Sequence, residues 1–340
     1  MTDKDPNRPI DRIRNSALSM KIGENGDGPI GTIIDMQQSL YSVHEHAIFA
    51  IQIADQIDPQ RTNTAIPNTQ QKVLSLGAQD PEVARTYLTA YTLFKSLHLG
   101  PRFDEKKSLQ LAFEFLAIIA AILDEQRRLD AATKVAVDEF EALPAKDRSL
   151  RLPALGDVSH RCNAFTQKIG HAVDMLEEIA RLFYPGEITN KWVDSLAVLL
   201  AQKHGEDASV TRAMQERGPA LLQLRRLRNM VEHPKDGDRI AVYDFKLLPS
   251  MELLLPSVNI QLPGEEPVTG SLVSLMEQVR SSLVDDAEHL FGLLVAANLQ
   301  PPSKFNICLI ELPEDRRPKW NPHQRLSYGI EINGQVQPLG

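Results

Sequence analysis

Residues 219–234 have the sequence PALLQLRRLRNMVEHP. A proline at each end delimits a helix over 220–232, because proline suits the first helical position and cannot continue a helix. One buried face is predicted by apolar residues at helical spacing: Leu221, Leu224, Leu227 (or Leu222) and Val231. The polar side chains that project elsewhere are Arg225, Arg228, Asn229 and Glu232.

The end of this helix gathers three kinds of polar group. At 100° per residue Arg228 and Glu232 lie one turn apart, as do Asn229 and His233, so a guanidinium, an amide and an imidazole surround one helix terminus. An imidazole of pKa about 6.5 takes or returns protons near neutral pH, and a guanidinium binds two phosphate oxygens at once. RNA cleavage requires a proton taken from a 2′-hydroxyl and positive charge beside the phosphate, so the set favours metal-free RNA chemistry. An ordinary surface helix capped by a histidine is the alternative.

Further helices are predicted on both sides of this stretch. Short connections between them indicate a compact antiparallel bundle. Between the bundle helices, residues 239–262 alternate apolar and polar positions with prolines among them, which predicts a small insertion of two or three strands. The predicted bundle helices are 159–183, 190–204, 208–217, 220–232 and 268–299, and the bundle with its insertion forms a domain over 159–302.

The first half of the chain predicts a second helical domain, over 36–145. Residues 1–35 are rich in glycine and proline and predict an extended arm, whereas 36–57 carry apolar residues at three- and four-residue steps, typical of a helix. Residues 104–143 contain neither Gly nor Pro and predict either one long helix or two that meet near 127–130. Short helices are expected at 71–76 and 82–97, and a polar linker at 146–158.

The last residues, 303–340, contain two strand-like runs, FNICLIEL and RLSYGIEI, and predict a small β tail. The expected fold class is therefore mainly α. It comprises two helical-bundle domains, the second with a small β-hairpin insertion, and a short β C-terminal tail.

Composition excludes several classes of protein. The chain has 340 residues, 37 Lys+Arg against 45 Asp+Glu, 42% hydrophobic residues and 2 Cys. Two distant cysteines form neither a disulfide framework nor a multi-cysteine metal site, which indicates a reducing, cytoplasmic setting. No signal peptide or membrane-spanning segment is expected. The net charge of −8 argues against a protein that coats nucleic acid with its whole surface.

The helix ending at His233 resembles the HEPN superfamily. The motif of that family is an arginine, four to six residues and then a histidine, with a polar residue often following the arginine, near the end of a helix in a four- or five-helix bundle. Arg228, Asn229 and His233 match these positions, and the resemblance covers roughly residues 160–300. The departures from a minimal member are the strand insertion after His233, the extra N-terminal domain and the C-terminal strands.

The resemblance implies a homodimer in which the motifs of two protomers form one cleft. Active HEPN proteins are metal-independent endoribonucleases, often of toxin–antitoxin or defence systems, so the expected partners are RNA and an antitoxin or defence-system protein, with no cofactor, metal or membrane. Arg228, Asn229 and His233 would be catalytic. Other members are nucleotide- or protein-binding scaffolds without catalysis, and this remains the alternative.

Local charge supports phosphate binding near the motif. Between residues 212 and 239 seven basic residues accompany four acidic ones, a local charge of +3. From this excess we expect Arg225, Arg226 and Lys235 to contact RNA phosphates. A solvated helix face is the alternative explanation. A weaker candidate is Asp285 with His289, one helical turn apart, either a metal pair or part of a solvated acidic face.

Overall fold

The chain forms two compact units, one of Met1–Phe113 with Leu299–Gly340 and one of Glu114–Asn298. This division differs from the expected boundaries, because both ends of the chain belong to the first unit. A computed structural model describes residues 8–16, 20–36, 39–144, 151–232, 237–250, 252–264, 266–300, 306–332 and 334–339. These residues form four antiparallel sheets besides the helices, so the expected mainly α fold of two bundles is wrong.

The first unit contains a four-stranded sheet where a helix over 36–57 was expected. Its strands lie in chain order: β1 (Ile30–Met36), β2 (Ser39–His44), β3 (Ile48–Gln52) and β4 (Thr69–Leu74). The apolar residues of 36–57 are also rich in β-branched and aromatic types, and two strands of period two joined by a short turn produce the same three- and four-residue steps. Pairing Val43 with Ile48 closes the hairpin. β4 likewise replaces the helix expected at 71–76.

Short helices precede, interrupt and follow this sheet. Arg61 joins α1 (Pro9–Asn15) to α2 (Ala54–Ile57), which lies between β3 and β4, because it donates to Asp11 and to Asp55. Pro81 begins a helix, as expected, but the helix ends at Leu93 rather than 97 and contains a π turn. Its segments are α3 (Pro81–Val83), η1 (Ala84–Leu88) and α4 (Thr89–Leu93), followed by α5 (Ser96–Leu99).

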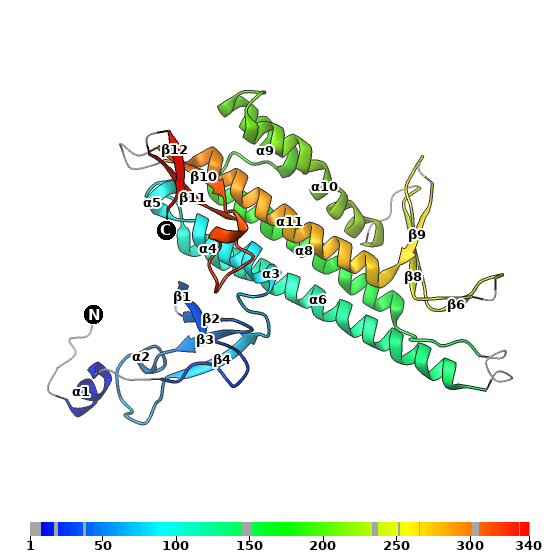
Figure 1. Cartoon of the computed structure of the whole chain (residues 1–340), viewed down its shortest axis with the longest axis horizontal. Helices are drawn as coiled ribbons and strands as arrows, with labels where there is room; N and C mark the ends of the chain where they lie inside the picture. Colours follow the sequence, from blue (N-terminus) through cyan, green and yellow to red (C-terminus); the bar gives the residue numbers. More distant parts are fainter. Residues whose placement is uncertain are drawn as a thin grey trace. The chain divides into compact units, whose positions relative to one another are not determined.

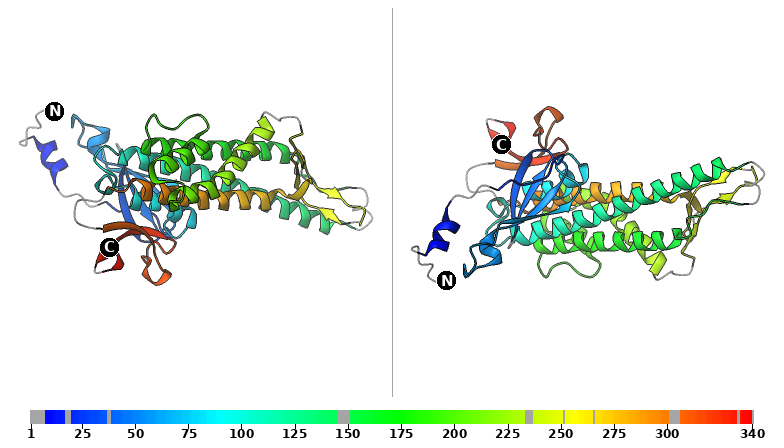
Figure 2. Two further views of the ribbon diagram at one scale, coloured as in Figure 1. Left: turned by 90° about the horizontal axis from the view of Figure 1, so that it is seen from above. Right: turned by 90° about the horizontal axis from the view of Figure 1, so that it is seen from below.

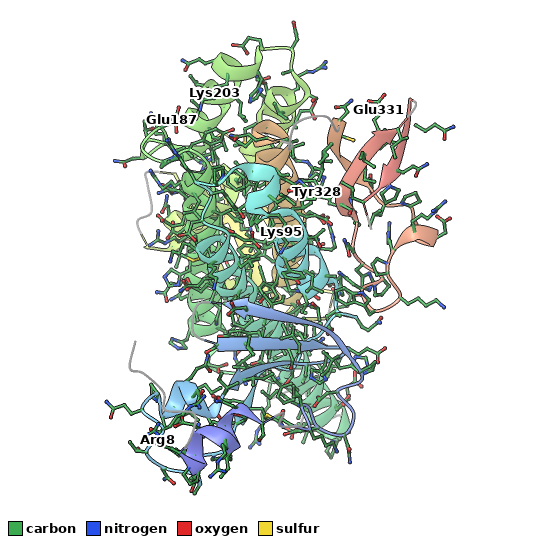
Figure 3. All side chains as sticks on the ribbon, turned by 90° about the vertical axis from the view of Figure 1, so that its left-hand side faces the viewer. Arg8, Lys95, Glu187, Lys203, Tyr328 and Glu331 are labelled. Carbon is green, nitrogen blue, oxygen red and sulfur yellow. The ribbon has the colours of Figure 1, made fainter. Side chains whose placement is uncertain are left out.

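The two strands expected in the C-terminal tail are present, and they belong to the first unit. β10 (Asn306–Glu311), β11 (Leu326–Ile332) and β12 (Gln335–Pro338) form one sheet, and a short 3-10 turn, η2 (Glu314–Arg316), lies between β10 and β11. Tyr328 on β11 donates a hydrogen bond to the Leu93 carbonyl at the end of α4. Figure 3 labels Tyr328 on β11.

The segment 104–143 forms a single helix, α6 (Glu105–Ala142), so the first of the two expected alternatives is confirmed. Its 38 residues run without a helix breaker for about 57 Å at 1.5 Å per residue. Within the second unit α6 is held by polar contacts. Arg161 lies 2.8 Å from the Glu125 carboxylate, and Arg280 donates to the Gln126 side chain at 3.1 Å.

The second unit is a helix bundle with strands at one end. α8 (Val158–Phe183), α9 (Trp192–His204), α10 (Ser209–Glu232) and α11 (Leu272–Asn298) form the bundle, and α10 packs on the other three. Figure 1 and Figure 2 show α8, α10 and α11 running side by side. The turn between α8 and α9 is held by the ion pair of Glu187 and Lys203, 2.9 Å apart (Figure 3).

One predicted helix boundary in this unit is wrong. Gly218 and Pro219 were expected to separate two helices, but both lie inside α10. Gly218 serves packing instead, because a Cβ at this position would come 2.9 Å from Cγ1 of Val193 on α9. The close contact with α9 holds the helix continuous through a residue that lacks an N–H donor.

The strand insertion is larger than expected. β5 (Arg239–Tyr243), β8 (Ser257–Gln261) and β9 (Val268–Ser271) form a three-stranded sheet, and β6 (Lys246–Leu247) pairs with β7 (Leu253–Leu254). β9 replaces the first turn of the helix expected at 268–299, because Val268 pairs with Ile260 and extends the sheet by one strand. The sheet contacts α8, α10 and α11 (Figure 1). It therefore lies where α10 ends and α11 begins.

Candidate functional site

The predicted site residues centre on the C-terminal end of α10. Arg228 and Asn229 lie on its last turns, both half-buried. His233 and Lys235 lie outside the described residues, so their side chains have no described position. The structure therefore places four of the six predicted residues: Arg225, Arg226, Arg228 and Asn229.

The side chain of Arg228 crosses α8 at a glycine. A Cβ built on Gly170 would lie 2.3 Å from Cδ and 2.8 Å from Nε of Arg228, far inside van der Waals contact. Gly170 is buried, and Nε of Arg228 is buried as well. The absence of a side chain at Gly170 thus creates the space through which the Arg228 side chain runs. Sequence reasoning missed Gly170, because nothing near it in the chain indicates which helix will face it.

Arg225 lies near an acidic group on α8. Its Nη1 is 3.7 Å from a carboxylate oxygen of Glu177. Glu177 also accepts hydrogen bonds from Arg181 on its own helix, at 2.5 and 3.2 Å. The carboxylate therefore lies between two guanidinium groups, and it reduces the positive potential that Arg225 was expected to supply.

Arg226 is ion-paired on a different face of α10. Its Nη2 lies 2.7 Å from Asp238 just before β5. At 100° per residue Arg226 and Arg228 point roughly 160° apart around the helix axis. The arginines expected to form one phosphate-binding surface are thus divided between two faces of α10. The carboxylates of both pairs are largely buried, with Glu177 14% and Asp238 7% exposed, so a phosphate that displaces either one leaves a buried carboxylate with one ion-pair partner fewer.

A pocket lies on the Arg226 face of α10, between α10, β8 and α11. It has a volume of about 450 Å³. Its walls are mostly aliphatic, with four polar side chains among them. The lining residues are Ala220, Gln223, Leu224, Arg226, Leu227, Met230, Ile260, Leu262, Leu275, Gln278, Val279 and Ser282. Sequence reasoning assigned Leu224 and Leu227 to a closed core face, and no local pattern shows that β8 and α11 leave space beside them.

A polar stripe continues from this pocket along α11. Ser282 lines the pocket and donates to Asp286 at 3.2 Å. Burial raises the pKa of the Asp286 carboxyl above its ordinary value. Farther along, Arg217 of α10 donates to Nε2 of His289 at 3.3 Å, which leaves Nδ1–H to donate to the Asp285 carbonyl at 2.6 Å. Each ring nitrogen of His289 thus has its own hydrogen-bond partner.

The part of the chain that the structure describes contains neither a group of metal-ligating side chains nor a helix that could span a membrane. There, no three His, Cys, Asp or Glu side chains are grouped so that they could hold a metal ion. Asp285 and His289 thus lack a third ligand among the described residues. The described helices also include none with the length and apolar character needed to cross a membrane.

A carboxylate ties the strand insertion to the start of α8. Oδ2 of Asp244 accepts hydrogen bonds from the backbone N–H groups of Leu155 and Gly156, each at 2.9 Å. Its other oxygen accepts from the Phe245 N–H at 2.8 Å. These contacts fix the sheet that follows α10, and with it one wall of the pocket.

The chain was compared with known proteins at the level of family, sequence and structure. No family model matches it, and no curated protein or solved structure matches it significantly.

Proposed function

We propose that the protein is a metal-independent endoribonuclease that acts as a homodimer. The observation that carries the proposal is the position of Arg228 and Asn229 on the last turns of α10, within an antiparallel helix bundle, directly before His233. With His233 next in the sequence, the set supplies a guanidinium, an amide and an imidazole, the groups that metal-free RNA cleavage can use.

Each residue of the motif has a distinct task in this proposal. His233 acts as general base toward the 2′-hydroxyl or as general acid toward the leaving oxygen. Arg228 binds the phosphate through two parallel hydrogen bonds and stabilises the charge of the transition state. Asn229 orients the phosphate or the imidazole. Arg225, Arg226 and Lys235 contact neighbouring phosphates, which requires Arg225 and Arg226 to exchange their carboxylate partners for RNA.

Gly170 supports the role assigned to Arg228. The guanidinium of an arginine on an open surface samples many positions, whereas the stem of Arg228 is confined between α10 and α8. Confinement lowers the entropy lost when a side chain binds a phosphate. The proposal also places the protein in the cytoplasm, with an antitoxin or defence-system protein as its controlling partner.

The test is cleavage of end-labelled RNA by the purified full chain in EDTA. We expect products with 2′,3′-cyclic phosphate ends, and we expect His233→Ala to lower the rate by at least about 100-fold, because general acid–base catalysis contributes on the order of 10²–10⁴. His204→Ala is the control, since His204 is an exposed histidine at the C-terminal end of α9, outside the motif. Equal cleavage by wild type and His233→Ala would refute the proposed chemistry.

A scaffold that binds a nucleotide or a protein without catalysis is the second candidate function. The ion pairs of Arg225 and Arg226 favour it, because they reduce the local positive charge on which RNA binding would depend. RNA that remains intact in EDTA and in Mg²⁺, together with measurable binding of nucleotides to the wild type, would support this candidate instead.

A further inference from the structure

The pocket between α10, β8 and α11 has the dimensions and chemistry of a small-molecule site. Pockets that hold small ligands typically enclose about 300–1,000 Å³, and this one encloses about 450 Å³. It shares the last turns of α10 with the motif, because Leu227 and Met230 line it while Arg228 and Asn229 lie next to them in sequence. A group that fills the pocket therefore lies across α10 from the Arg228 side chain, about one helix diameter of 10–12 Å away.

The arrangement of apolar and polar groups favours a flat heteroaromatic ring. Leu224, Leu227 and Met230 form one wall, and Leu275 and Val279 form the facing wall. Proteins commonly hold an extruded base between apolar side chains and hydrogen-bond its edge.

The polar groups that would meet the ring edge are side-chain amides and a hydroxyl. Gln223 and Gln278 are exposed at the mouth of the pocket, and Ser282 is half-buried at its end near Asp286. An amide offers both a donor and an acceptor, the combination that pairs with a base edge. An aliphatic chain would leave these groups without partners, and unpaired polar groups disfavour binding.

The mouth of the pocket carries a guanidinium that can bind a phosphate. Arg226 lines the pocket, and its side chain is 44% exposed. Binding a phosphate attached to the bound base requires Arg226 to exchange Asp238 for that phosphate.

We propose that this pocket receives one unpaired nucleobase of the RNA, with its edge against Gln223, Gln278 and Ser282 and its phosphate at Arg226. The inference rests on the proposed ribonuclease function and assigns that site a base-binding subsite. Single-stranded RNA would then be the preferred substrate, because a base must leave its stack to enter the pocket.

The test blocks the pocket without touching the motif. Ala220→Phe fills the pocket from α10, whereas Leu222→Phe introduces the same ring two residues away at a position that is 42% exposed and lies outside the pocket. Binding of the four nucleoside monophosphates to the full chain is measured by calorimetry, and cleavage of single-stranded RNA is measured in parallel. We expect Ala220→Phe to weaken nucleotide binding at least tenfold and Leu222→Phe to leave it unchanged.

A second variant tests the subsite independently, in case Ala220→Phe does not fold. Gln278→Leu keeps the shape of an exposed side chain and removes its amide, so we expect about tenfold weaker binding of the preferred monophosphate, the loss of one bidentate base contact. If no monophosphate binds the wild type, or if both variants bind as wild type does, the base-binding subsite is refuted.

The two proposals fail separately. RNA cleavage without nucleotide binding in the pocket would overturn the subsite and leave the ribonuclease standing. Nucleotide binding that Ala220→Phe abolishes, without any cleavage by wild type, would support the pocket and refute the ribonuclease.

Discussion

The contact between Gly170 and Arg228 predicts a specific energetic coupling. Gly170→Ala places a methyl group 2.3 Å from Cδ of Arg228 if nothing moves, so the arginine stem must shift. Overpacking of this kind costs about 1–3 kcal/mol. Replacing a helix-interior glycine by alanine stabilises the helix by about 1 kcal/mol. We therefore expect Gly170→Ala to destabilise the wild type by about 0–2 kcal/mol, the difference between these two effects.

The same substitution has the opposite effect once the arginine is shortened. In an Arg228→Ala background Cδ and Nε are absent, the clash disappears and only the helix gain of about 1 kcal/mol remains. A double-mutant cycle over the two positions should thus give a coupling free energy of about 1–3 kcal/mol, the size of the overpacking cost.

Urea unfolding of the four proteins measures this coupling. Trp192 is buried in the second unit, and Trp320→Phe removes the other tryptophan of the chain, so the remaining fluorescence reports the unit that contains both positions. A coupling below about 0.5 kcal/mol, within the additivity expected for independent sites, would refute the packing of Arg228 on Gly170. If that packing also positions the guanidinium, Gly170→Ala lowers the rate of RNA cleavage as well.

Three further predictions concern the rest of the chain. Arg61 has a left-handed φ of 54° and is 5% exposed, and it donates to Asp11 of α1 and to Asp55. Hydrogen bonds from Arg8 and Arg61 lower the pKa of the Asp11 carboxyl. The docking of α1 should therefore be unchanged down to about pH 4, the ordinary pKa of an aspartate, and should be lost as the pH falls further. Hydrogen exchange of residues 8–16 across pH measures this, and protection that disappears already at pH 6 would contradict it. Gly77→Ala places a Cβ 2.4 Å from the His44 carbonyl oxygen, a backbone atom that cannot yield, so the first unit should lose about 3 kcal/mol in urea unfolding followed by Trp320 fluorescence. A loss below about 1 kcal/mol, the lower end of overpacking costs, would show that the approach is looser. Burial raises the pKa of the Cys162 thiol to about 11. A thiol reagent at pH 8 should therefore modify Cys308 in the native protein and leave Cys162 unmodified until the protein unfolds. Fast modification of both cysteines in the native protein would refute this prediction.

Some helices were predictable because their local signals agree. Residues 104–143 lack Gly and Pro, and they form one helix through the whole segment except its ends. The helix expected at 159–183 is observed as Val158–Phe183, because its apolar residues repeat at helical spacing over seven turns. In such segments propensity and periodicity favour the same structure.

Other segments carried signals compatible with two structures. The apolar steps of 36–57 fit one helix or two short strands, and the pairing of β1 and β4 on either side selects the strands. Gly218 and Pro219 usually end a helix, but contact with Val193 of α9 keeps α10 continuous. Both outcomes depend on residues distant in the chain, which periodicity cannot detect.

For the candidate site as well, some features follow from the sequence and others only from the tertiary structure. The sequence alone determined which residues are candidates for the proposed chemistry, since Arg228, Asn229 and His233 lie within six residues and their expected spacing follows from helix geometry. Only the tertiary structure decided what surrounds them: Gly170 beneath Arg228, Glu177 beside Arg225, Asp238 beside Arg226 and the pocket on the opposite face. The physical reason is that spacing along a helix fixes the angle between side chains, whereas the groups they meet belong to other elements that packing brings together.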